Sequence, residues 1–136
     1  IGAAMSPLNA FQFIQGVETL PLRIRRHCEN AAKVADFLVS QDGVTRVIYP
    51  GHMDGEARCR ADTYLNDGLF GALVGFELDG GVDAGRKFID SLELLYHVAN
   101  IGDARSLAIH PASTTHSQLS EEDQVLAEQY LKSGNN

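Results

Sequence analysis

The chain has 136 residues, of which 44% are hydrophobic, and it carries a formal net charge of −7. Domains of roughly 100 to 150 residues are the commonest, so we expect a single domain over residues 1–136. The negative charge argues against a nucleic-acid partner, which would need clustered Lys and Arg. No apolar run reaches the roughly 20 residues that span a bilayer, and the N-terminus lacks the order of a secretory signal. The sequence therefore predicts a soluble, cytoplasmic protein that does not bind a membrane.

The predicted elements alternate helices with short strands. Residues 6–41 have a helical pattern that Gly16 and Pro21 interrupt, which predicts two helices meeting near residues 18–21. β-branched or alternating runs predict strands, and 3.6-residue spacing or a capping pattern predicts helices. In chain order, the remaining elements are a strand at 44–49, a short helix near 56–64, a strand at 72–78, a helix over 82–92, strands at 94–98 and 106–109, and a helix over 120–131.

This order favours an α/β chain of the two-layer α+β type, with helices packed on one face of a small, mainly antiparallel sheet. The second helix carries an apolar stripe at spacings of three and four, made of Leu20, Ile24, Cys28, Ala31, Ala35 and Leu38. Four short strands leave unpaired edges, which invite a partner, so the sequence also allows a homo-oligomer.

The candidate functional groups gather between Tyr96 and His116, where a strand, a polar turn, a second strand and a loop of hydroxyl and imidazole groups follow one another. This order indicates the wall of a ligand site. Asn100 before Ile101-Gly102 also suits an ordinary turn. Ser113 and Thr115 could equally satisfy backbone groups of their own loop. The residues alone leave both interpretations open.

The same stretch contains residue types that suit two further chemistries. His97, His110 and His116 could converge on zinc, but they have no i, i+4 pairing and no carboxylate partner. Ser113, His116 and Asp103 could form a hydrolase triad, but no Gly-Xxx-Ser-Xxx-Gly elbow supports it. We therefore predict neither a catalytic residue nor a metal ligand in the chain.

Several segments together resemble the C-terminal domain of the pyridoxal-phosphate (PLP) enzymes of cysteine and methionine metabolism, and within them the O-acetylhomoserine sulfhydrylases. The resemblance covers nearly the whole chain to about Ser120, and it implies the fold of the C-terminal domain of fold-type I PLP enzymes. Its segments are Ser6-Pro7-Leu8-Asn9-Ala10-Phe11, Gln15-Gly16-Val17-Glu18-Thr19-Leu20, His27-Cys28-Glu29-Asn30-Ala31, Val47-Ile48-Tyr49-Pro50-Gly51, and the run from Tyr96 to His116.

The resemblance implies a γ-replacement, in which sulfide or a thiol displaces acetate from an activated homoserine. It implies substrate contacts at Asn100, Ser113 and Thr115, and PLP as the cofactor of the complete enzyme. The family holds PLP on a lysine in a Ser-Xxx-Thr-Lys context, and none of the three lysines of this chain has that context. The chain is therefore expected to lack the N-terminal cofactor domain and the final strand, to bind no cofactor by itself and to be inactive alone.

Two alternatives stay open. The Asn100-Ile101-Gly102-Asp103 turn resembles the sulfhydrylases more than the Ser-Leu-Gly-Gly type of their relatives, but those relatives remain alternatives. They are cystathionine γ-synthase, cystathionine γ-lyase and methionine γ-lyase. An alternative of another class is a non-catalytic domain that associates with a second copy of itself through its sheet edge.

Overall fold

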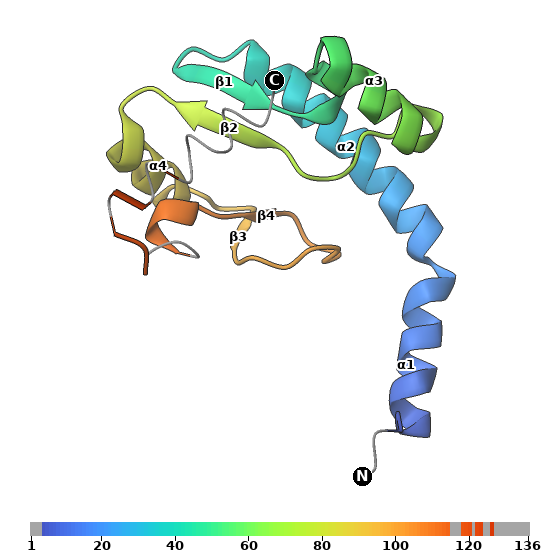
Figure 1. Ribbon diagram of the computed structural model, residues 1–136. Helices are drawn as coiled ribbons and strands as arrows, with labels where there is room; N and C mark the ends of the chain where they lie inside the picture. The colour runs from blue at the N-terminus through green and yellow to red at the C-terminus, as the bar shows by residue number, and fades with distance from the viewer. Residues whose placement is uncertain (1–3, 115–117, 121, 124–125, 127–136) are drawn as a thin grey trace. The chain divides into compact units, whose positions relative to one another are not determined.

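The computed structural model describes residues 4–114, 118–120, 122–123 and 126. The chain divides into two compact units, one of residues 1–38 and 48–75 and the other of residues 39–47 and 76–136. The helices and strands (Figure 1) are α1 Pro7–Glu18, α2 Leu20–Val39, β1 Val44–Ile48, α3 Gly55–Tyr64, β2 Gly75–Leu78, α4 Gly81–Asp90, β3 Tyr96–His97 and β4 Leu107–Ala108. Three 3-10 turns accompany them, η1 Pro50–His52, η2 Asn66–Gly68 and η3 Pro111–Ser113.

All the helices and strands predicted up to residue 109 are present, although several strands are shorter than predicted. The helix predicted over 120–131 lies largely outside the described residues. Its predicted start is visible, because the Ser120 hydroxyl accepts a hydrogen bond from the Asp123 backbone N–H at 3.1 Å. The prediction of a single domain over residues 1–136 stays a prediction.

In the first unit, α1 and α2 meet at a bend (Figure 1), as the sequence predicts. Thr19 closes α1, and Pro21, in the first turn of α2, has no N–H to continue the helical ladder. The guanidinium of Arg23 bonds across the bend, to the Gly16 carbonyl at 3.0 Å and to the Thr19 hydroxyl at 2.7 Å. One side chain therefore replaces part of the hydrogen bonding that the bend removes.

The core of the first unit lies along α2. Cys28, Ala31 and Ala35 of the predicted stripe are buried, and Tyr49 and Ala61 are buried as well. Burial of the Tyr49 ring raises the pKa of its hydroxyl, and the nearby Cys28 and Asp36 add to this effect. The small side chains on α2 leave room for the large Tyr49 ring, and together they form a close-packed core.

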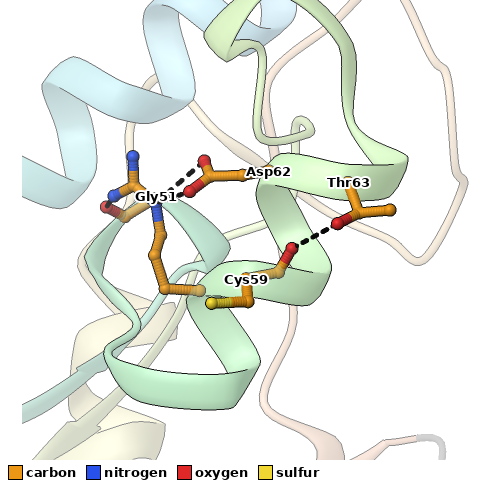
Figure 2. A network of polar contacts seen from close by, with 5 residues as sticks. Gly51, Cys59, Asp62 and Thr63 are labelled. Atoms are coloured by element: carbon orange, nitrogen blue, oxygen red, sulfur yellow. Dashed lines mark hydrogen bonds and ion pairs between the residues drawn. The ribbon is translucent and has the colours of Figure 1, made fainter.

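A network around Arg58 joins α3 to the η1 turn (Figure 2). The Arg58 Nε lies 3.0 Å from both carboxylate oxygens of Asp62, and its Nη1 donates to the Gly51 carbonyl at 2.9 Å. The guanidinium also lies 4.7 Å from the centre of the Phe70 ring. A Cβ on Gly51 would lie 2.8 Å from the Tyr49 ring, so only glycine lets the turn approach this closely.

In the second unit, β1 and β2 form an antiparallel pair. The Asp79 N–H donates to the Gly43 carbonyl at 2.8 Å, and the Thr45 hydroxyl donates to the Glu77 carbonyl at 3.3 Å, so residue numbers rise on one strand as they fall on the other. Helix α4 packs on β2 through Phe88, whose ring contacts Phe76 edge to face at 5.3 Å.

The strands β3 and β4 form a second, separate pair, and they run parallel. Tyr96 is opposite Leu107, and His97 is opposite Ala108. The mixed class of helices with a small sheet is confirmed, but the sheet is two pairs of strands, and only one of them is antiparallel. The connection between β3 and β4 is a wide loop (Figure 1), and not the two-residue turn of a tight antiparallel hairpin.

The side chains of α4 and of the residues after it differ in burial. Ile89 is buried, and Phe88 and Leu92 are half-buried. Val82, in the first turn of α4, is 48% exposed. In the described part of the chain, no helix combines the length and the hydropathy needed to cross a membrane.

Candidate functional site

The parallel pairing of β3 and β4 brings two predicted substrate contacts to one edge. Asn100 comes three residues after the end of β3, and Ser113 comes five residues after the end of β4. Because the carboxyl ends of parallel strands lie at the same edge of a sheet, both loops leave from that edge. A hairpin would have sent Ser113 to the opposite edge. Thr115, the third predicted contact, lies outside the described residues.

Asn100 belongs to a hydrogen-bonded group with Asp103 and Arg105. The Asn100 Nδ2 donates to the Asp103 Oδ2 at 3.0 Å. Arg105 approaches the same carboxylate with its side chain, Nη2 to Oδ2 at 3.0 Å and Nε to Oδ1 at 3.1 Å. The Arg105 backbone N–H adds a fourth bond, to Oδ1 at 2.9 Å. Both oxygens of Asp103 are thus held by donors.

These donors hold the pKa of Asp103 well below its usual range. The largest cause is the side-chain hydrogen bond from Arg105, followed by the Arg105 backbone N–H and the Asn100 amide. The carboxylate is only 13% exposed, whereas Arg105 is 53% exposed. Arg105 also stacks on Tyr96 of β3, with its guanidinium carbon 4.6 Å from the ring centre. The loop between β3 and β4 is therefore fixed to the strand from which it leaves.

Ser113 lies in a second hydrogen-bonded group, with His110. The Ser113 Oγ is 2.8 Å from the His110 Nδ1 and donates to the His110 carbonyl at 3.3 Å. The imidazole lies directly against Gly85 of α4, where a Cβ would come within 2.6 Å of it. A glycine on α4 therefore makes room for the ring that contacts Ser113.

The geometry gives no support to the metal and hydrolase alternatives. Among the described residues, no three His, Cys, Asp or Glu side chains are close enough to hold a metal ion. His116, which both alternatives need, is outside those residues. Asp103 is bonded to Arg105 and Asn100, and the imidazole beside Ser113 is His110. Asp103 thus binds a guanidinium, although a triad would need it to orient an imidazole.

PLP requires a lysine whose amine is held in a pocket and kept unprotonated by its surroundings. Lys33 on α2 and Lys87 on α4 are both exposed helix residues, and Lys132 is outside the described part of the chain. Neither described lysine fits the cofactor. What the two loops offer is a set of polar groups that can orient a small polar ligand.

Comparison with known proteins identifies the class. Residues 1–129 match the model of the family described as Cys/Met metabolism PLP-dependent enzyme. The O-acetyl-L-homoserine sulfhydrylase of Leptospira meyeri is 56% identical over 127 residues, which are 93% of this chain and 29% of that protein. The chain therefore belongs to the Cys/Met metabolism PLP-dependent enzyme family, and it spans about 29% of the length of that relative.

Solved structures agree with this assignment. A crystal structure of an O-acetylhomoserine (thiol)-lyase from Campylobacter jejuni, with a pyridoxyl-lysine at its position 205, superposes with a TM-score of 0.79 at 42% identity, over 89% of this chain and 28% of that one. Cystathionine γ-synthase from Xanthomonas oryzae, in complex with aminoacrylate and cysteine, gives 0.78 at 36% identity, over 93% and 32%. The resemblance in the sequence and the predicted fold class are both confirmed.

The sequence alone does not reveal which residues hold Asn100 and Ser113. Asp103 and Arg105 stand two residues apart, which is the spacing at which a carboxylate can accept from the backbone and side chain of the same arginine. That spacing, three residues after an Asn, could have suggested the network. The contact of His110 with Gly85 joins residues far apart in the chain, and no local pattern signals it.

Proposed function

We propose that this chain is the substrate-side, C-terminal domain of a PLP-dependent enzyme of the O-acetylhomoserine sulfhydrylase type. The complete enzyme would replace the acetate of O-acetylhomoserine by sulfide or a thiol. The observation that carries this proposal is the 56% identity to the Leptospira meyeri sulfhydrylase over 93% of the chain. PLP, when bound in the complete enzyme, supplies the electron sink for the γ-replacement. Asn100, Ser113 and Thr115 would contact the amino-acid substrate from this chain.

The partner that completes the site would be a cofactor domain supplying the Schiff-base lysine. Helix α1 supports this part of the proposal, because it has no buried residue. Its large apolar side chains are each more than half exposed, namely Leu8, Phe11, Phe13, Ile14 and Val17. Phe13 and Val17 share one side of the helix, and Leu8 and Phe11 share another, so α1 is apolar on two sides. A helix of this kind is usually buried within a larger protein.

The cofactor domain explains α1 better than a second copy of this chain does. A helix of 12 residues is roughly 18 Å long. One face of it is small beside the roughly 800 Å² that each partner of a stable complex buries. Contacts between domains of one protein need no such area, because the connection keeps the domains at high effective concentration. Association with a second copy of the chain, the alternative of another class, would have to bury further surface in addition to the apolar surface of α1.

A chimera tests the proposed activity. The matching residues of this chain would replace their counterparts in the Leptospira meyeri enzyme, and homocysteine formation from O-acetylhomoserine and sulfide would be measured. We expect turnover by the chimera and none by the isolated chain with added PLP. An inactive chimera that still binds PLP would contradict the proposal, and so would PLP-dependent turnover by the isolated chain. Preference for cystathionine formation or for methionine cleavage would favour cystathionine γ-synthase, cystathionine γ-lyase or methionine γ-lyase instead.

We also place this reaction in the cytoplasm. Both cysteines, the buried Cys28 and the exposed Cys59, are free thiols, which suits a reducing compartment. Fractionation of cells followed by detection of the chain would test this.

A further inference from the structure

Asn100 is held by its neighbours in a way that bears on how it could contact a substrate. We propose that Asp103 and Arg105 are positioning residues for Asn100, which they hold with one amide N–H aimed away from the loop, toward the carboxylate of an α-amino acid. This inference rests on the proposed function, because it assigns roles around the same substrate contact. It adds two residues that do not touch the substrate themselves.

The first step is the orientation of the Asn100 amide. An asparagine side chain can be placed with its oxygen or its nitrogen toward a neighbour, and the hydrogen bonding decides which. The neighbour is the Asp103 Oδ2, at 3.0 Å from the Asn100 Nδ2. A carboxylate only accepts, so the NH₂ end must face it and the reverse orientation would set two oxygens against each other. One N–H is used in this bond, and the second stays available for an anionic group.

The second step is charge. An ionised carboxylate 3.0 Å from Asn100 would repel the carboxylate of an incoming amino acid if nothing balanced it. Arg105 supplies the balance, because its guanidinium binds both oxygens of Asp103 at 3.0 and 3.1 Å. The pair leaves the loop with no net charge beside Asn100. Asp103 can therefore orient the amide without excluding the ligand that the amide is meant to bind.

The third step is rigidity. Orientation helps binding only if the orienting groups are themselves fixed. Arg105 is stacked on the Tyr96 ring at 4.6 Å, and the Tyr96 backbone N–H donates to the Ser106 carbonyl at 3.0 Å. The arginine is thus anchored to β3 through its side chain, and its neighbour in sequence is anchored through the backbone. The far end of the loop that carries Asn100 is therefore held to β3 by the Arg105 side chain and by the Ser106 carbonyl.

The electrostatic step gives an unusual expectation for kinetics in the active chimera. Arg105→Gln should raise the KM for O-acetylhomoserine by well over about tenfold, because it leaves the charge of Asp103 unbalanced. Asp103→Asn should raise it less, by roughly tenfold at most, because the neutral amide oxygen at that position orients the Asn100 N–H less strongly than a carboxylate does. The double variant should have a lower KM than Arg105→Gln alone, because the repelling charge is gone. The KM for sulfide, which has no carboxylate, should not change in any of them.

Arg86→Gln on α4 is the matched control, since it removes an exposed arginine outside this loop, and its KM should equal that of the parent chimera. A merely structural role would make the double variant at least as poor as Arg105→Gln, and that order would overturn the inference. An unchanged KM in Asp103→Asn would overturn it as well, with the proposed function intact. An inactive parent chimera would remove the proposed function first and this inference with it.

A second measurement needs only the 136-residue chain. The two side-chain protons of any asparagine differ in chemical shift, because rotation about the amide C–N bond is slow, so each is compared with the same proton of an unbonded asparagine. In nuclear magnetic resonance spectra, the Asn100 proton that binds Asp103 should lie downfield of that reference. Asp103→Asn should move it upfield, and Arg86→Gln should leave it in place. A reference shift in the unaltered chain, or a shift that Asp103→Asn does not move, would overturn the inference even if no chimera folds.

Discussion

Gly85 is a position where one added methyl group should disturb the candidate site. A Cβ there would lie 2.6 Å from the His110 ring, which contacts Ser113. We expect Gly85→Ala to lower the free energy of unfolding, because overpacking costs about 1–3 kcal/mol and outweighs the gain of about 1 kcal/mol in helix propensity. Urea unfolding would measure this. Gly16→Ala is the control, with no atom within 4 Å of its Cβ, and it should be neutral or stabilising. Equal effects of the two changes would contradict the close contact.

Asp103 sets the pH dependence of the loop. Its pKa is lowered by donors from Arg105 and Asn100. A lowered folded-state pKa means that the stabilisation is fully present above the unfolded value of about 3.9 and is lost only as the pH falls through the lower folded value. The resonance of the Arg105 Nε–H should therefore stay constant from pH 7 to about pH 3. A shift of that resonance with its midpoint near about pH 4 would mean that Asp103 titrates normally and that the network does not form.

At the scale of elements, α3 carries two arginines whose replacement should change the unfolding free energy by different amounts. Arg58 binds Asp62 through both oxygens, the Gly51 carbonyl and the Phe70 ring, whereas Arg60 is paired with Glu56 at 2.8 Å on the surface. We expect Arg58→Lys to cost about 1 kcal/mol of unfolding free energy, since an ammonium cannot make the planar contacts. Arg60→Lys should cost less than about 0.5 kcal/mol. Thermal unfolding would compare them, and an equal loss in both would show that the network adds nothing.

The sequence predicted elements more reliably than it predicted how they pair. The bend between α1 and α2 follows from Pro21 and Gly16, which act locally, and the buried Cys28 follows from the spacing on α2. The parallel pairing of β3 with β4 depends on how a wide loop returns, and adjacent residues do not encode that return. Asn100 was singled out by its resemblance to a family, but the partners that orient it became visible only through distances.

At the scale of the whole molecule, the family match and the helix α1 point in the same direction. The chain matches the family over residues 1–129 but spans about 29% of the sulfhydrylase relative. Its first helix has no residue in the core. Apolar side chains that no part of the chain buries contribute little to the stability of the chain alone. Their contribution is expected in the complete enzyme.

This difference gives a prediction that compares the isolated chain with the chimera. Phe13 is 63% exposed, so Phe13→Glu should change the unfolding free energy of the isolated chain by less than about 0.5 kcal/mol. In the chimera, the same change should cost about 3 kcal/mol or more, because it would place a charge where an aromatic ring is buried. Gln12→Glu adds the same charge at the preceding residue, which lies on the polar side of α1, and it should be tolerated in both proteins.

Thermal unfolding of the four variant proteins, beside their two parents, would decide between the possible covers of α1. A large effect of Phe13→Glu confined to the chimera would place the phenylalanine against the cofactor domain. A large effect already in the isolated chain, together with dimers in sedimentation equilibrium that the change abolishes, would assign α1 to a second copy. Equal, small effects in both proteins would mean that α1 stays exposed in the complete enzyme. The exposure of α1 would then give no support to the proposed cofactor domain, and only the family match would support that domain.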